Sequence, residues 1–210
     1  LADHLIKEQQ GQAVNYRQQS LQKYRDYAAE NRDFPLSQFR GRHSSSTEAV
    51  GYGKTLMFFH MLRKKLGDDV FVRALQTLYR DYRFRIASFD DVRQVFERVS
   101  GEPLKRFFAQ WVERTGAPKL VLKDTRVEQD AGRYRLTFTL QQTQSGDPYQ
   151  LEVPIAVSLQ DQLQAKEFVV HMAAREKTVE VDLPTPPTRV DVDPGFDLFR
   201  KLAIDETPPA

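Results

Sequence analysis

One change of hydrophobic period divides this sequence, and it falls at Gly116-Ala117-Pro118. Before that point apolar residues recur every three or four positions, which is the period of an amphipathic helix. After it they alternate with polar residues, which is the period of a half-buried strand. The sequence therefore predicts an α+β chain. We expect a helical part at 1–116, a small antiparallel β-sandwich at 117–203 and a polar, proline-rich tail at 204–210.

The first half contains the start and stop signals of several short helices. Gly11, Gly67 and Ser100-Gly101 are expected to end helices, because glycine readily takes the left-handed conformation found there. Ser88 with Asp91 three positions later is close to a capping box. Apolar positions expected on buried helix faces include Leu56, Phe59, Leu62, Leu66, Val70, Phe71, Ala74, Leu75, Leu78, Val92, Val95, Phe96, Leu104, Phe107, Phe108 and Trp111. Short antiparallel helices with tight connections predict a helical layer or small bundle.

Two details of this half depend on polar residues. Residues 40–47 are rich in Gly and Ser, so we expect a loop there, with the helical pattern resuming at Thr47. Asp68 or Asp69 is expected to cap the helix that follows Gly67.

The second half predicts five or six short strands. Turn signals separate the alternating runs, at Asp130-Ala131-Gly132, at 145–148 and at 184–187. So many short strands within about 75 residues are typical of an antiparallel β-sandwich. Pro154 lies inside one run, which predicts an edge strand or a bulge because proline cannot donate to a sheet.

Composition narrows the possible functions. The 31 Lys and Arg residues nearly balance the 29 Asp and Glu residues, so the whole chain gives no case for nucleic acid or for an anionic membrane. The basic and aromatic run at 80–85 is interpreted as a solvated helix end, with nucleic-acid binding as the less favoured alternative. The lack of Cys excludes disulfides, thiol catalysis and cysteine-ligated zinc. No apolar run approaches the ~18 residues of a membrane span.

The chain begins at Leu1, inside a predicted helix and without Met. We therefore expect a piece of a longer protein, so that any signal peptide or anchor lies upstream. The sequence leaves the compartment open between a bacterial periplasmic or membrane-associated protein and a cytoplasmic one.

Motifs for metal binding do not occur. No His-x-x-x-His pair is formed by the four histidines, which are His4, His43, His60 and His171. A weak metal site at His4, with Asp3 and Glu8 on the same helix, is an alternative to the favoured interpretation as a packing or surface residue. His60 is expected to hydrogen-bond a neighbour.

Motifs for nucleophilic catalysis and phosphate binding also fail. Ser44-Ser45-Ser46 has no nucleophile elbow, and the chain contains no Gly-x-Ser-x-Gly. Gly53-Lys54-Thr55 matches the end of a Walker A motif, but Glu48 stands where its first glycine belongs.

Tyr52 is the residue with the clearest chemical possibility. It lies at the first turn of an apolar helix, directly after a polar loop. A phenol in that place can donate to an oxyanion that forms on a carbonyl under attack. The spacing alone favours the simpler alternative, in which the ring packs at the helix start and the hydroxyl faces water.

Several strings occur in a characteristic order along the chain. They are Leu1–Leu5, Tyr52-Gly53-Lys54, Leu62-Arg63, Leu66-Gly67-Asp68, Phe71, Ser88–Phe96, Ser100-Gly101, Leu104, Phe107-Phe108, Gln110-Trp111-Val112, Gly116-Ala117-Pro118, Asp193-Pro194 and 196–202. In order and spacing they resemble zinc aminopeptidases of the aminopeptidase N type, the gluzincins. The resemblance covers nearly the whole chain.

This resemblance implies roles for several residues. Residues 1–116 would be the helical C-terminal part of a thermolysin-like metallopeptidase catalytic domain. Tyr52 matches the family's catalytic tyrosine, which stabilises the tetrahedral intermediate of peptide hydrolysis, and Lys54 matches a supporting lysine two positions on. Thr55 departs from the family's usual Gly. The His-Glu-x-x-His helix, the third zinc ligand and the residues that bind the substrate amino terminus would all lie before Leu1.

The leading hypothesis is therefore a fragment of a zinc metallopeptidase, a hydrolase of peptides. Zinc and peptide substrate are expected for the intact parent, while the fragment has no metal ligand or cofactor of its own and is inactive alone. Its expected partner is the missing N-terminal catalytic half, whose absence would leave an apolar face exposed. The alternative is a non-catalytic interaction or scaffold module derived from the same fold. Substrate preference, oligomeric state, the role of the sandwich and the parent's retention of zinc ligands stay open.

Overall fold

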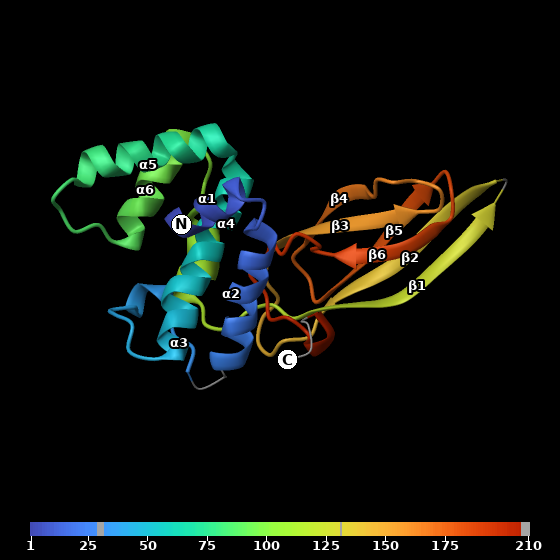
Figure 1. Cartoon of the computed structure of the whole chain (residues 1–210), viewed down its shortest axis with the longest axis horizontal. Helices are drawn as coiled ribbons and strands as arrows, with labels where there is room; N and C mark the ends of the chain where they lie inside the picture. Colours follow the sequence, from blue (N-terminus) through green and yellow to red (C-terminus); the bar gives the residue numbers. More distant parts are fainter. Residues whose placement is uncertain (29–31, 131, 207–210) are drawn as a thin grey trace. The chain divides into compact units, whose positions relative to one another are not determined.

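The computed structural model describes residues 1–28, 32–130 and 132–206. The chain forms two compact units, Leu1–Gly116 and Ala117–Ala210. Figure 1 draws the first in blue to green and the second in yellow to red. Unit 1 is helical and unit 2 is built from strands, so the predicted α+β class, with helices first and strands second, is confirmed.

Unit 1 consists of helices of different lengths. The α-helices are α1 (Ala2–Gln9), α2 (Ala13–Tyr27), α3 (Ser45–Glu48), α4 (Thr55–Leu66), α5 (Asp68–Tyr82), α6 (Phe89–Ser100) and α7 (Lys105–Phe108). A 3-10 turn, η1 (Leu36–Gln38), follows α2, and π-helical segments precede α4 and follow α7, at η2 (Ala49–Lys54) and η3 (Ala109–Glu113). α5 packs against α6, and α2 packs against η2.

Local capping signals decide where two helices begin. Ser88 accepts from the backbone N–H of Asp91, and the Asp91 carboxylate accepts from the N–H of Ser88, which confirms the capping box of α6. Ser44 and Thr47 form a second capping box. Because that box starts α3 at Ser45, the loop predicted at 40–47 is three residues too long.

The predicted cap of α5 is wrong. Gly67, with φ of 79°, is both the C-cap of α4 and the N-cap of α5. No other residue stands between the two helices, so no carboxylate can take the N-cap position. Asp68 is the first helical residue, and its carboxylate accepts instead from the guanidinium of Arg63 at 2.7 and 2.8 Å.

An aromatic cluster around Phe58 forms the core of unit 1. Its ring meets those of Phe59, Phe89, Phe107 and Phe108 at centroid distances of 5.0–5.9 Å, mostly edge to face. Among the predicted core positions, the buried ones are Leu56, Leu62, Phe71, Ala74, Val92, Val95, Phe96, Leu104, Phe108 and Trp111. The half-buried ones are Phe59, Leu66, Val70, Leu75, Leu78 and Phe107.

Unit 2 contains two antiparallel sheets of three strands. The strands are β1 (Leu120–Asp130), β2 (Arg133–Gln142), β3 (Leu151–Leu159), β4 (Lys166–Met172), β5 (Glu176–Leu183) and β6 (Pro187–Val192). One sheet has the order β1-β2-β5 and the other β4-β3-β6. The central strands β2 and β3 each bury alternate side chains, which are Leu136, Phe138 and Leu140 in β2 and Val153, Ile155 and Val157 in β3. These residues make the core that the period of two predicts.

Pro154 lies in a central strand, so the predicted edge position is wrong. Its carbonyl accepts from the N–H of Asp193 at 2.7 Å, directly after β6 ends at Val192. The register of β3 with β6 begins at Ile155, which pairs with Val192. The missing N–H of proline therefore faces the end of the ladder, where the cost of a lost hydrogen bond is smallest.

Only part of two predicted segments can be described. Ile204–Glu206 form the 3-10 turn η4, while the rest of the predicted tail, 207–210, lies outside the described residues. Ala131 of the predicted turn after β1 also lies outside them. Across the described ranges, no helix has both the length and the apolar character needed to cross a bilayer.

Candidate functional site

Tyr52 lies in the π-helical segment η2 and is 58% exposed. Its neighbours in the segment face inward, because Val50 and Lys54 are both buried. The Tyr52 ring meets the edge of the Phe39 ring at a centroid distance of 5.6 Å. A π-helical turn is rare and is often found at functional sites. The sequence signal at Tyr52 thus corresponds to a tyrosine whose ring is supported on one side and open to solvent on the other.

Gly51 makes room for the ring that supports Tyr52. A Cβ at this position would lie 2.1 Å from the Phe39 ring, closer than any real contact. At Gly53 the nearest atom to such a Cβ is the carbonyl oxygen of Ser20 at 3.6 Å, which is ordinary contact. The close approach of Phe39 to η2 therefore requires glycine at position 51 and not at position 53.

Lys54 holds the segment η2 through a buried hydrogen bond. Its side chain is buried, and Nζ donates to the backbone carbonyl of Arg114 at 2.7 Å. Burial lowers the pKa of Lys54, an effect that nearby Asp33 opposes and Arg114 reinforces. Lys54 therefore acts in this structure as an anchor that ties η2 to the end of η3.

Thr55 does not disturb this geometry. It takes helical angles, φ of −64° and ψ of −41°, where η2 passes into α4. An ordinary right-handed conformation imposes no need for glycine. The departure from the aminopeptidase pattern at position 55 leaves the backbone at Tyr52 regular.

Asp33 is a residue of the site that the sequence pattern did not reveal. Its carboxylate accepts from the hydroxyl of Tyr24 at 2.8 Å, from the N–H of Phe34 at 2.9 Å and from the N–H of Gly116. It thereby joins the end of α2, the loop before η1 and the last residue of unit 1. The Asp-Phe-Pro string predicts a turn, but it does not predict that Asp33 will bind the N–H of Gly116, 83 residues further along the chain.

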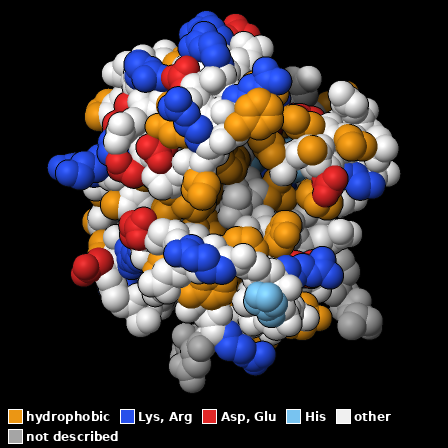
Figure 2. All heavy atoms as spheres, turned by 90° about the vertical axis from the view of Figure 1, so that its left-hand side faces the viewer, with side chains coloured by type: hydrophobic (Ala, Val, Ile, Leu, Met, Phe, Trp, Pro, Cys, Tyr) orange, Lys and Arg blue, Asp and Glu red, His pale blue; other side chains and the backbone are white. Residues whose placement is uncertain are grey.

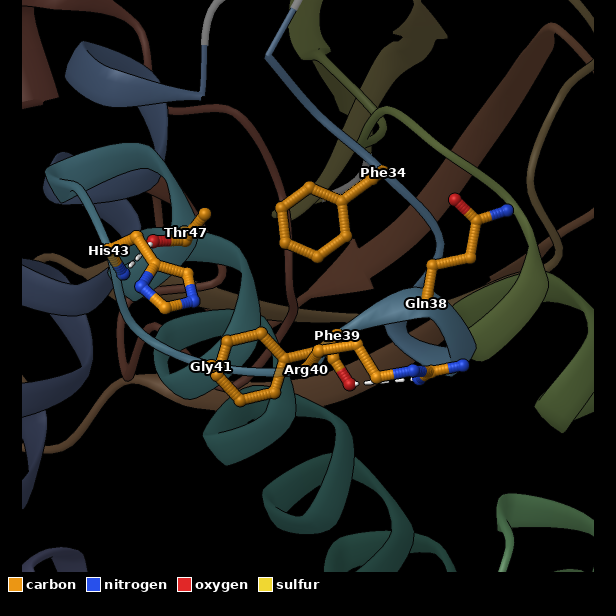
Figure 3. A pocket seen from close by; sticks show the side chains of 7 residues that line it. All are labelled: Phe34, Gln38, Phe39, Arg40, Gly41, His43 and Thr47. Atoms are coloured by element: carbon orange, nitrogen blue, oxygen red, sulfur yellow. Dashed lines mark hydrogen bonds between the residues drawn. The ribbon is translucent and has the colours of Figure 1, made fainter.

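A pocket of about 230 Å³ is lined in part by Phe39. Figure 3 shows His43 and Thr47 at one side of it, Gln38 and Arg40 at the other, and the rings of Phe34 and Phe39 between them. Phe34 and Phe39 are nearly parallel at a centroid distance of 6.4 Å. Aromatic walls with a few polar side chains are typical of sites that hold small organic groups.

The two buried histidines, His4 and His60, are not among the residues that line this pocket. His4 is buried, its Nε2 lies 3.0 Å from an Arg17 guanidinium nitrogen, and its ring lies 5.2 Å from that of His60. Because arginine can only donate, His4 Nε2 must accept and carries no proton. Burial lowers the pKa of His4 to about 4, and the charges of His60 and Arg17 add to this effect.

Within 1–28, 32–130 and 132–206, no set of three or more His, Asp or Glu side chains is placed to hold a metal ion. At His4, the residue of the alternative weak metal site, the Nε2 lone pair faces the Arg17 guanidinium.

Comparisons with known proteins point in one direction. No protein-family model matches the chain. "Aminopeptidase M1-C" of Oryza sativa is 33% identical over 87 residues, which are 40% of this chain and 10% of that protein. "Aminopeptidase M1-B" of the same plant is 27% identical over 173 residues, or 79% of this chain and 18% of that protein. "Aminopeptidase N" of Lactococcus lactis is 28% identical over 82 residues, or 38% of this chain and 10% of that protein.

The fold gives the same relationship. The crystal structure of Legionella pneumophila aminopeptidase A in complex with aspartic acid matches with a TM-score of 0.59 and 16% identity, over 90% of this chain and 22% of that chain. The chain thus spans between a tenth and about a fifth of the length of these proteins. In sequence and in fold, it is similar to one part of the aminopeptidases of the aminopeptidase N type, as the resemblance predicts.

Proposed function

We propose that this chain serves peptide-bond hydrolysis as part of a longer aminopeptidase-like protein, with Tyr52 as the hydrogen-bond donor to the oxyanion. The observation that carries this proposal is the placement of Tyr52, which is 58% exposed in a π-helical segment whose neighbouring side chains are buried. The names of the relatives, aminopeptidases M1 and N, support a peptide substrate.

The chemistry assigned to Tyr52 is specific. When a nucleophile attacks a peptide carbonyl, the carbonyl oxygen becomes negatively charged, and a fixed phenol can donate to it. The donor has to be held before the charge develops, because reorganisation during the reaction costs energy. Phe39 supports the ring and Lys54 anchors the backbone, so both act as positioning residues.

The pocket lined by Phe34 and Phe39 is a candidate for holding part of the substrate. The ring of Phe39 lines the pocket and also contacts the ring of Tyr52. A group bound in the pocket and the phenol would therefore both pack on Phe39. Its two aromatic walls favour an apolar group, while Arg40, His43 and Gln38 provide polar atoms at the rim.

Zinc does not fit the described residues of this chain. They offer no cluster of three or more ligating side chains, and Arg17 takes the lone pair of the buried His4. In metallopeptidases zinc polarises the carbonyl and activates water. We assign any such ion, and the gluzincin motif, to sequence outside this chain, and we expect the chain by itself to hydrolyse nothing.

The alternative, a non-catalytic interaction module, has one observation in its favour. Apolar side chains at the N-cap of α1, on α1 and at the start of α2 are exposed, namely Leu1, Leu5, Ile6 and Val14. Exposed apolar residues close together mark surfaces that another protein or another part of the same protein covers. The expected exposed face is therefore compatible with both functions, and only an activity assay separates them.

The assay uses a longer polypeptide that contains this chain and an aminoacyl-p-nitroanilide substrate. Tyr52→Phe should lower kcat on the order of a hundredfold, because an oxyanion donor acts only in the transition state. Tyr79→Phe is the matched control, since it removes another exposed tyrosine hydroxyl of unit 1. Little change with Tyr52→Phe would remove this tyrosine from catalysis, and absence of hydrolysis by the longer wild-type polypeptide would favour the interaction module.

A further inference from the structure

The connection between α5 and α6 exposes large apolar side chains. Phe84 is 93% exposed and Ile86 is 98% exposed, and Tyr79 on the last turns of α5 is also exposed. Figure 1 shows this connection at the periphery of unit 1, beyond the ends of both helices. Large apolar side chains that are exposed close together mark an interaction site, whereas apolar residues exposed singly are normal on a protein surface.

The turn itself does not require a phenylalanine. The N–H of Arg85 donates to the carbonyl of Tyr82 at 2.9 Å, which closes the turn. Phe84, within it, takes φ of 62°, a left-handed conformation that favours Gly or Asn over a bulky residue. The backbone thus holds an unfavourable residue type at a highly exposed position.

The turn carries the positive charges of Arg83 and Arg85, and two of its three acidic neighbours are ion-paired, whereas the third, Asp91, accepts only from neutral groups. Asp81 accepts from Arg80 and Arg98. Asp91 accepts from Ser88 and Tyr82, and Asp90 accepts from Arg93.

Two arginines remain available at this turn. Among the residues that the structure describes, Arg83 and Arg85 form no ion pair with a carboxylate. Both are exposed. The guanidinium of Arg83 lies over the Phe84 ring, 4.8 Å from its centroid. The turn therefore presents two positive charges directly beside two apolar side chains, and Figure 2, which views this side of the molecule, shows basic and hydrophobic side chains next to each other.

We propose that this turn docks on a membrane surface that contains anionic lipids. Phe84 and Ile86 enter the interface between headgroups and acyl chains, where aromatic and aliphatic side chains are favoured. Arg83 and Arg85 bind the lipid phosphates, which planar guanidinium groups recognise through paired hydrogen bonds. This surface role is independent of the peptidase function proposed for Tyr52.

A nucleic acid fits the same turn less well. Single-stranded nucleic acids stack their bases on open aromatic faces. Arg83 already covers one face of the Phe84 ring, and Ile86 has no aromatic face to offer. A lipid surface uses both apolar side chains, whereas a nucleic acid would use neither fully.

The test is sedimentation of the 210-residue chain with sucrose-loaded vesicles. One set contains phosphatidylcholine with phosphatidylglycerol, and the other contains phosphatidylcholine alone. We expect binding to the anionic vesicles that weakens with salt. Arg83→Gln and Arg85→Gln should each weaken it about fivefold, and the pair Phe84→Ser with Ile86→Ser should weaken it at least about tenfold.

Matched controls come from unit 2. Leu163→Ser removes another fully exposed apolar side chain, and Lys177→Gln removes another exposed charge. Both should bind as the wild type does. Circular dichroism and the fluorescence of Trp111 confirm that each variant is folded.

Three results would overturn the proposal. The first is no binding to anionic vesicles, and the second is binding that the Phe84 and Ile86 changes leave intact. The third is equal binding to neutral vesicles. Binding of an oligonucleotide or of polyglutamate that depends on Arg83 and Arg85, without vesicle binding, would assign the turn to a soluble polyanion instead.

Discussion

The ammonium group of Lys54 donates a 2.7 Å hydrogen bond to the backbone carbonyl of Arg114, 60 residues further along the chain. This bond ties the π-helical segment that carries Tyr52 to the end of the last helical segment of unit 1. Asp33 binds the N–H of Gly116 close by, and its charge favours the protonated lysine. The position of the exposed tyrosine thus depends on buried polar contacts between distant parts of the sequence.

Replacing the lysine should therefore loosen unit 1. Lys54→Met keeps most of the buried volume but removes the donor to the Arg114 carbonyl, which should cost about 1–3 kcal/mol of unfolding free energy. Urea unfolding followed by the fluorescence of Trp111, the single tryptophan, reports on this unit. Lys105→Met, at an exposed position on α7, should change stability by less than about 0.5 kcal/mol. Equal effects of the two changes would show that the Lys54 anchor is unimportant.

Gly51 and Gly53 form a matched pair for testing the support of Tyr52. Gly51→Ala forces a Cβ against the Phe39 ring and should destabilise unit 1 by about 1–3 kcal/mol. Gly53→Ala finds ordinary contact at 3.6 Å and should stay within about 0.5 kcal/mol of the wild type or gain slightly. Unfolding in urea measures both, and a tolerated Gly51→Ala would contradict the packing of Phe39 on η2.

His4 should make unit 1 sensitive to acid. Its pKa is lowered to about 4 by burial, while an unfolded histidine has a pKa near 6.5. Between these values the unfolded chain binds the extra proton, so stability rises with pH through this window and is lost as pH falls toward 4. The full effect is on the order of 3 kcal/mol.

Urea unfolding at pH values of about 7.5 and about 5 measures this contribution. His4→Gln should flatten the difference between the two pH values. His43→Gln, at an exposed position, should leave it unchanged. A pH dependence that survives in His4→Gln would place its origin elsewhere.

In unit 2 the buried pair of Asp193 and Arg200 should be essential to stability. Arg200 Nε donates to the Asp193 carboxylate at 2.9 Å, with both side chains almost fully buried. Burial raises the pKa of Asp193 to about 6, although Arg200 acts in the opposite direction. Arg200→Met leaves a buried carboxylate without its cation and should cost about 3–5 kcal/mol.

The cost of Arg200→Met should also depend on pH. Above the pKa of Asp193 the carboxylate is charged and needs its cation, whereas near pH 5 it can take a proton, so the loss should be larger at neutral pH. Hydrogen exchange of peptides from β3 and β6 measures the effect. Arg189→Met, which removes an exposed partner of Asp191, should cost less than about 1 kcal/mol. A loss that is the same at both pH values would contradict a titrating Asp193.

The features that the sequence predicted correctly are local ones. The change of period near Gly116 marks the order of helices and strands, because burial on one face fixes periodicity within a few residues. The capping box of Ser88 and the helix end at Gly101 also depend on neighbours within one turn. The predicted cap at Asp68 is wrong for a local reason too, since Gly67 is the N-cap of α5 and Asp68 is already the first helical residue.

The features that could not be predicted join residues that are far apart in sequence. Asp33 looks like a turn residue, yet it binds Tyr24 and Gly116. The need for glycine at position 51 comes from Phe39, which only the folded loop brings close. Pro154 is tolerated in a central strand because β6 ends beside it. The alternation of apolar and polar residues in β3 does not predict which strands lie on either side of it.

The central claim is that Tyr52 stabilises the oxyanion. Its most direct test is the affinity of a phosphinic peptide, which carries a tetrahedral oxyanion, for a longer active polypeptide containing this chain. With Tyr52→Phe, we predict that this affinity and kcat/KM fall by the same factor, on the order of a hundredfold, while KM changes little. Unchanged affinity for the phosphinic peptide, with kcat/KM equal to that of Tyr79→Phe, would contradict the claim.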